Sequence, residues 1–226
     1  LAPSLSAHTF TGTVEIDIEI LKPTSRLVLN SIELTIHSAS VVINGTTHTA
    51  ATTLDDETER LTLTLDGEVA AGPATVQVAF DGILNDQLHG FYRSTYTADD
   101  GTEHTIATTQ FQSTDARRCF PCWDEPEYKA TFETTLIVDA DHLAVTNTSE
   151  VAETTLDDGR RRIQYAPTMV MSTYLVAFVV GPLEATEPIH AGGVPIRVVH
   201  RPGQGDRTSF ALDVAAAALD WFADYY

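Results

Sequence analysis

The stretch TTQFQSTDARRCFPCWDEP, residues Thr108–Pro126, constrains the fold of this chain more than any other segment. It combines two glutamines, an Asp-Ala-Arg-Arg run, a Cys-Phe-Pro-Cys turn and a Trp-Asp-Glu-Pro end. Few of these residues suit a regular strand or helix, because charges and prolines interrupt both periodicities. We expect a strand over 103–112, a single helical turn over 114–119 and then an irregular loop.

The charged residues of this stretch predict ion pairs that hold the loop in place. They are Asp115, Arg117, Arg118, Asp124 and Glu125. The planar guanidinium of arginine suits bidentate pairing with a carboxylate. We assign these residues a structural role in preference to substrate contact.

Cys119 and Cys122 are the two cysteines of the chain, and they have C-x-x-C spacing. A redox pair needs a strand-to-helix context with the first cysteine at a helix N-terminus, whereas Pro121 precedes the second cysteine here. Two ligands also cannot complete a structural zinc site. We expect two reduced, buried thiols.

On both sides of this stretch, apolar residues recur at every second position. Val14, Ile16, Ile18 and Ile20 would share one face of a strand, and so would Leu61, Leu63 and Leu65, and Val76, Val78 and Phe80. Further strands are expected near 26–30, 32–37, 40–49, 90–97, 129–138, 161–166, 172–180 and 194–200. Turn signals such as Asn44-Gly45, Asp66-Gly67 and Asp81-Gly82 separate them. The pattern predicts an all-β fold, either a sandwich or a saddle-shaped twisted sheet.

The pattern becomes helical after Gly203-Gln204-Gly205. Apolar residues then follow at spacings of three and four, and Asp206 or Thr208 could cap the helix. We expect a domain boundary near 204, with a β-domain over 1–204 and a helix over 205–226.

Composition excludes some classes of partner. The chain carries 32 acidic and 13 basic residues, for a net charge of −19. Nucleic acids and anionic membranes require clustered lysine and arginine, so we expect neither as a partner. No apolar run is long enough to span a bilayer and no signal peptide is apparent, so we expect a cytoplasmic protein.

Four further blocks of sequence, taken together with Thr108–Pro126, resemble the sequence of one protein family. They are His8-Thr9-Phe10-Thr11-Gly12-Thr13-Val14, Gly90-Phe91-Tyr92-Arg93-Ser94, the strand-like block from Met171 to Phe178, and the helical end from Leu219 to Tyr226. Together with Thr108–Pro126 they resemble the N-terminal β-domain of zinc aminopeptidases of the aminopeptidase N family. The last block resembles the first helix of that family's thermolysin-like catalytic domain.

The resemblance implies an enzyme that uses zinc to remove N-terminal amino acids from peptides. Members carry G-x-M-E-N and H-E-x-x-H motifs, in which two histidines bind zinc and the glutamate acts as general base. Here none of the eight histidines is followed by glutamate, and no G-x-M-E-N occurs. We therefore expect no catalytic residue and no bound metal in this chain, and an inactive domain in the absence of the catalytic one.

The resemblance also assigns substrate-binding roles to Gln110 and Gln112. In the family, side chains at these positions bind the free α-amine of the peptide and line the pocket for its first side chain. Position 112 is glutamate in many members, and a neutral amide holds an ammonium group less strongly than a carboxylate does. From composition alone, two glutamines on a strand would more often be ordinary solvent-facing residues.

Two alternatives stay open at this point. Gln112 is shared with leukotriene A4 hydrolases, which would make the parent bifunctional. The β pattern alone would also fit a free-standing β-sandwich binding module, although such a module would not need the helix over 206–226.

Overall fold

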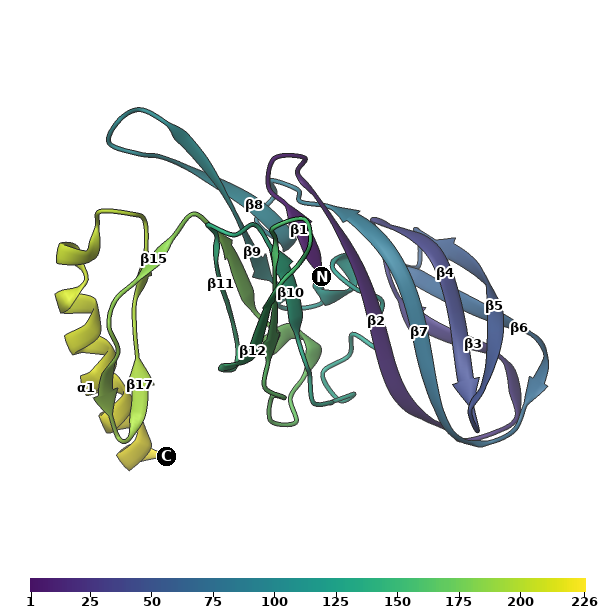
Figure 1. Cartoon of the computed structure of the whole chain (residues 1–226). Coiled ribbons are helices and arrows are strands. Elements are labelled where there is room, and N and C mark those ends of the chain that lie inside the picture. Colours follow the sequence, from purple (N-terminus) through teal and green to yellow (C-terminus); the bar gives the residue numbers. More distant parts are fainter.

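The computed structural model describes residues 1–226 and has three parts arranged in a row. Figure 1 shows a large curled sheet at one end, a smaller β region in the middle and a helix at the other end. The fold is therefore all-β with a C-terminal helix, as the alternating pattern predicts. No helix in it is long and apolar enough to cross a membrane.

The curled sheet is antiparallel and holds the first seven strands in the order β1-β2-β7-β4-β5-β6-β3. The strands are β1 (Ala2–Ser4), β2 (Thr9–Ile20), β3 (Thr24–Asn30), β4 (Leu34–Ile43), β5 (Thr46–Asp55), β6 (Arg60–Val69) and β7 (Gly72–Ile83). The predicted alternation decides which face is buried: Leu61, Leu63, Val76 and Phe80 are all inaccessible to solvent, while their sequence neighbours are not.

The middle region contains a four-stranded and a three-stranded sheet. The first has the order β11-β14-β9-β8 and the second β10-β13-β12. Their strands are β8 (Gly90–Thr97), β9 (Glu103–Gln110), β10 (Thr135–Val138), β11 (Leu143–Thr146), β12 (Glu150–Thr155), β13 (Arg161–Tyr165) and β14 (Phe178–Gly181), with the short 3₁₀ helices η1 (Ala116–Arg118) and η2 (Thr173–Leu175) between them.

The C-terminal part contains two short antiparallel pairs and the helix. The pairs join β15 (Glu184–Ala185) to β18 (Val199–His200) and β16 (Ile189–Ala191) to β17 (Val194–Ile196). After the 3₁₀ helix η3 (Gly205–Arg207), the helix α1 (Ser209–Tyr225) packs against the β16–β17 hairpin.

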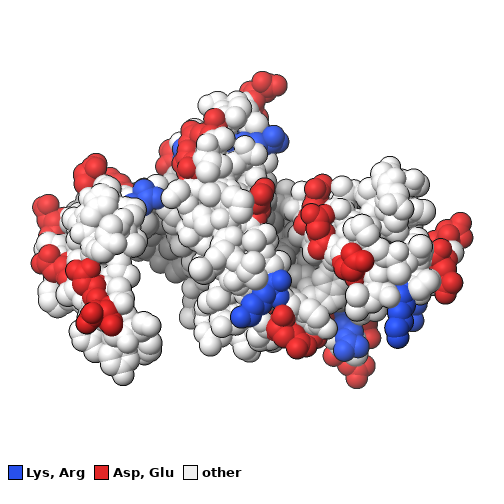
Figure 2. Space-filling model, turned by 90° about the horizontal axis from the view of Figure 1, so that it is seen from below, with Lys and Arg blue, Asp and Glu red and all other residues white.

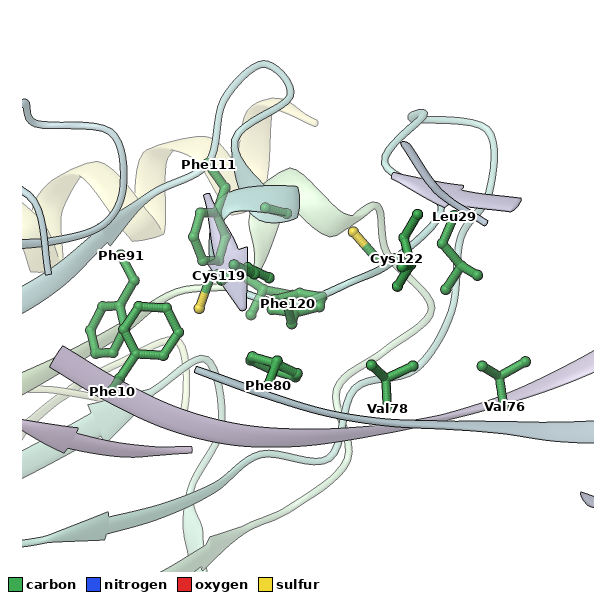
Figure 3. Close-up of a cluster of buried hydrophobic side chains, with 14 of the residues drawn as sticks. Phe10, Leu29, Val76, Val78, Phe80, Phe91, Phe111, Cys119, Phe120 and Cys122 are labelled. Carbon is green, nitrogen blue, oxygen red and sulfur yellow. The ribbon is translucent and has the colours of Figure 1, made fainter. Parts of the chain in front are cut away.

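Aromatic side chains join the curled sheet to the middle region (Figure 3). The Phe10 ring of β2 lies 5.2 Å from that of Phe91 on β8, which lies 4.9 Å from Phe178 on β14. Phe111 packs edge-on against both Phe178 and Phe120. Because these rings belong to a single core cluster that spans both regions, the two regions share one interior.

Several predicted strand boundaries are wrong, each for a local reason. The expected strand over 40–49 is two strands, because Asn44 and Gly45 adopt positive φ and turn the chain between β4 and β5. Likewise, the 194–200 segment divides into β17 and β18. Only Thr135–Val138 of the 129–138 segment forms a strand.

The segment over 172–180 is also not one strand. Residues Thr173–Leu175 form η2, and β14 begins only at Phe178. The strand over 103–112 ends at Gln110. At the helix, Thr208 occupies the N-cap position, but its hydroxyl donates to the Gly205 carbonyl at 2.7 Å and does not cap α1. Asp206 lies within η3.

Gly82 of β7 lies directly against the Phe10 ring, so the fold requires glycine at this position. A Cβ atom there would overlap the ring carbons of Phe10, which is almost completely buried. We expect Gly82→Ala to lower the free energy of unfolding by about 1–3 kcal/mol, since a packed core resists added volume. Urea denaturation followed by circular dichroism measures the change.

Gly205→Ala is the matched control for this substitution. The nearest atoms to a Cβ at this position would be those of the His200 ring, 3.6 Å away, and the φ of Gly205 is not positive. Equal stabilities of the two variants would contradict the tight packing of β7 on Phe10.

Candidate functional site

The segment from Phe111 to Glu125 leaves β9, forms η1 and then crosses to the edge of the curled sheet. There it pairs with the end of β3: the Asn30 N–H donates to the Cys122 carbonyl at 2.7 Å, and the Cys122 N–H donates back at 3.1 Å. The Ile32 N–H donates to the Arg117 carbonyl at 3.2 Å. We call residues 111–125 the connecting loop, because its backbone hydrogen bonds attach the middle region to β3. The single turn η1 confirms the helical turn expected over 114–119.

Asp124 is the buried anion of the connecting loop. Its side chain is 0% exposed and accepts from Arg117 Nε at 3.0 Å, while the Arg117 side chain is 11% exposed. The other carboxylate oxygen accepts from the Thr173 hydroxyl at 2.6 Å. Because Thr173 belongs to η2, this one carboxylate links the loop to the segment that leads into β14.

A second group of ion pairs surrounds Arg118. Its guanidinium pairs with Asp115 at 2.7 Å and with Glu33, and Arg117 reaches Glu59 at 2.9 Å. Burial opposes the charge on Arg118, but hydrogen bonds to Asp115 and Glu33 outweigh it and raise the pKa of the guanidinium. Glu33 and Glu59 belong to turns of the curled sheet, so both arginines join the two regions.

The expectation of ion pairs is thus confirmed for Asp115, Arg117, Arg118 and Asp124, and is wrong for Glu125. Glu125 is exposed and has no ion-pair partner, since the chain turns Asp124 inward and leaves the next side chain in solvent. The partners Glu33, Glu59 and Thr173 were not foreseen. They lie far from the loop in sequence, and no local pattern distinguishes them.

Cys119 and Cys122 are free and fully buried, as expected. Burial raises the pKa of both thiols above the ordinary range, because a thiolate loses its hydration there. The two sulfur atoms point in different directions among apolar side chains (Figure 3). Their surroundings are those of core residues and do not favour reactive thiolates.

Gln110 and Gln112 stand where β9 gives way to the connecting loop. Gln110 is the last residue of β9 and pairs with Gly90 of β8, whereas Gln112 lies beyond the strand, before a cis peptide bond to Ser113. Both side chains are exposed, while Phe111 between them is buried. Neither side-chain amide makes a hydrogen bond within the chain, so their donors and acceptors are available to another molecule.

No three histidine, cysteine, aspartate or glutamate side chains converge to hold a metal ion. The residues of this chain therefore do not fit the zinc site implied by the resemblance. A hollow of about 490 Å³ on the curled sheet is lined by residues such as Ile18, Val42 and Pro73, and it does not include the two glutamines. A small hollow of about 40 Å³ lies at Tyr96, His104 and Arg201.

Removal of the Asp124 carboxylate tests the connecting loop. We expect Asp124→Ala to lower the free energy of unfolding by about 3–5 kcal/mol, because it removes the fully buried partner of the nearly buried Arg117 and leaves the Thr173 hydroxyl without its acceptor. Urea denaturation of the variant and the parent chain measures this difference.

Glu125→Ala is the matched control, because it removes the adjacent carboxylate from an exposed position. We expect a change within about 0.5 kcal/mol for it. A similar loss for both variants would mean that the charge of the loop matters and that the Asp124 contacts do not.

Comparison with known proteins gives one consistent result. The family model described as the peptidase M1 N-terminal domain matches residues 1–175. The chain is 41% identical to aminopeptidase M1 of Arabidopsis thaliana over its whole length, which corresponds to 26% of that protein. It is 37% identical to the puromycin-sensitive aminopeptidase of Caenorhabditis elegans and 33% identical to the human endoplasmic reticulum aminopeptidase 1.

In the last two cases the chain covers 24% of the relative, so it spans about a quarter of the proteins that it resembles. The matched residues include the whole of the connecting loop and most of the two β regions described above. This chain belongs to the peptidase M1 N-terminal domain family.

Proposed function

We propose that this chain is the N-terminal β-domain of a zinc aminopeptidase that removes N-terminal amino acids from peptides. Its family membership and its similarity to three aminopeptidases support this function. The observation that carries the site assignment is the pair of exposed glutamines with no hydrogen-bond partner, at the end of a well-anchored strand.

The chemistry of the two side chains suits a free α-amine. An ammonium group offers three donors, and each glutamine offers one carbonyl oxygen as acceptor. Phe111, buried in the shared core, anchors the backbone between them. Gln110 and Gln112 would therefore orient the amine, and part of the pocket for the first side chain would lie next to them.

The zinc ion and the general base would come from another part of the same polypeptide, because this chain offers no metal-binding cluster. We propose that residues 1–204 form the β-domain and that 205–226 belong to the catalytic domain that follows. The exposed apolar side chains of α1 support this division. Phe210, Val214, Trp221 and Tyr225 recur at spacings of four and seven and are all exposed, although one side of the helix already packs on the β16–β17 hairpin.

A leukotriene A4 hydrolase-like enzyme is the second candidate, and the one observation that favours it is glutamine at position 112. An assay of the full-length enzyme with an epoxide substrate separates the two. Hydrolysis of peptides without conversion of the epoxide supports an aminopeptidase alone.

The chain by itself is expected to have no aminopeptidase activity and to retain no stoichiometric zinc. The reason is the missing H-E-x-x-H motif. Metal analysis after dialysis and cleavage of aminoacyl-coumarin substrates test this. One tightly held zinc ion per chain, or turnover above the buffer rate, would refute the division of roles between the two domains.

In the full-length enzyme we expect Gln112→Ala to lower kcat/KM for peptides with a free amine by up to about tenfold, which corresponds to one hydrogen bond of about 1.4 kcal/mol. Gln112→Glu should strengthen binding of the ammonium group through a charge-assisted bond, unless a neighbouring carboxylate repels the new charge. Steady-state kinetics on one aminoacyl substrate measures both.

Gln77→Ala is a suitable control, because Gln77 lies on β7 of the curled sheet, where its side-chain Nε2 donates a hydrogen bond to the Glu15 carboxylate. Kinetic constants of Gln112→Ala equal to those of the wild-type enzyme would make Gln112 an ordinary surface residue.

A further inference from the structure

The chain segment Leu175–Ala177 leads into β14, and β14 pairs with β9, the strand that ends at Gln110. Strand β14 pairs with β9 so that Val179 is opposite Thr108 and Val180 opposite Ala107. The Phe178 N–H donates to the Thr109 hydroxyl at 3.1 Å, which extends the contact by one residue. Extrapolated by one residue beyond the start of β14, this register places Ala177 opposite Gln110. Leu175, the last residue of η2, precedes Ala177 by two residues, just as Gln112 follows Gln110 by two.

The two segments also expose and bury their side chains in the same way. Leu175 and Ala177 are exposed and Val176 between them is buried, just as Gln110 and Gln112 flank buried Phe111. The Phe111 ring packs edge-on against Phe178, with ring centroids 6.1 Å apart. Val176 and Phe111 both belong to the shared core, and their exposed neighbours Leu175, Ala177, Gln110 and Gln112 lie outside it.

The side chain of Asn147 holds this segment from its other side. Its Nδ2 atom donates to the Leu175 carbonyl at 2.8 Å, and its Oδ1 atom accepts from the Ala177 N–H at 2.9 Å. The hydroxyl of Thr173, at the start of η2, is bonded to buried Asp124. Hydrogen bonds therefore hold the backbone at Leu175 and Ala177, and the nearby Thr173 side chain, in place, while the Leu175 side chain stays 47% exposed.

We propose that Leu175 is a specificity-determining residue, which supplies the apolar wall of the site where Gln110 and Gln112 hold the amine. This inference rests on the proposed aminopeptidase function and adds a substrate class to it. A peptide whose amine reaches the glutamines places its first side chain within a few ångströms of them. A half-exposed leucine on a fixed backbone favours a bulky apolar side chain there, such as leucine or phenylalanine.

The test compares full-length wild-type enzyme with Leu175→Ala on alanyl-, leucyl- and phenylalanyl-coumarin substrates. We expect kcat/KM for the leucyl and phenylalanyl substrates to fall about tenfold relative to the alanyl substrate, since only they reach the truncated side chain. Leu175→Met keeps most of the apolar volume and should retain the wild-type ratio. Leu21→Ala is the matched control, because Leu21 is 84% exposed in the turn between β2 and β3.

The possible failures can be told apart. Wild-type enzyme that cleaves none of the three substrates would overturn the proposed function itself. Normal wild-type activity with an unchanged substrate ratio in Leu175→Ala would overturn only the role of Leu175. An equal loss on all three substrates, with or without a lower melting temperature, would also overturn it, because a purely structural residue would not discriminate among first side chains.

Discussion

The buried carboxylate of Asp124 is the contact on which the arrangement of the two β regions depends. A carboxylate without solvent is stable only when its charge is paired and its oxygens accept hydrogen bonds. Arg117 and Thr173 meet these needs from two different segments, and the Asp124 N–H is bonded to the Asn30 side chain at the edge of the curled sheet. Asp124 thus joins the connecting loop to η2 through its carboxylate and to the end of β3 through its backbone N–H.

This constraint explains how an irregular loop can hold a functional surface. The connecting loop starts at Phe111, between the two glutamines, and its pairing with β3 leaves it little freedom to move relative to the curled sheet. The same carboxylate fixes the start of η2, from which Leu175 and the rest of the neighbouring segment follow. Both sides of the proposed substrate surface are therefore positioned from a single buried group. Sites attached to a rigid support in this way keep their geometry better than sites on free loops.

The sequence predicted those features of the fold that follow from the local spacing of apolar residues. The alternation over β2, β6 and β7 identified both the strands and their buried faces, and the helical spacing after Gly205 identified α1. This reasoning from spacing failed for segments whose secondary structure is determined by tertiary contacts. Strand β12 is exposed along its whole length and has no apolar alternation, so it lacks the periodicity by which the other strands were recognised. The apolar run from Met171 looks like a strand, yet η2 forms there.

The candidate site was likewise predicted in part: local residue types indicated some of its features, and distant contacts determine the others. Gln110 and Gln112 came from the resemblance to a family, and their roles stay a prediction, whereas the ion pairs of the connecting loop were expected from the types of residue alone. Their partners could not be expected, because Glu33 and Glu59 become neighbours of the loop only when β3 and the turns around it fold against it. Glu125 was misassigned because sequence does not say which of two adjacent carboxylates faces inward. In Figure 2 the acidic side chains form scattered groups among larger uncharged areas of the visible face, and the basic ones form no continuous patch, in keeping with the net charge of −19.

Native-state hydrogen exchange of this chain tests most directly whether the connecting loop joins the two β regions into one unit. The informative amides are those of Asn30, Ile32 and Cys122, which all take part in bonds between the loop and the curled sheet. The account predicts that they exchange with the same free energy of opening as Val76 and Val78 in the middle of β7, because the loop opens only when the core does. Exchange of the three amides at a much lower free energy than that of β7 would contradict it, since the loop would then detach while the sheet stays folded.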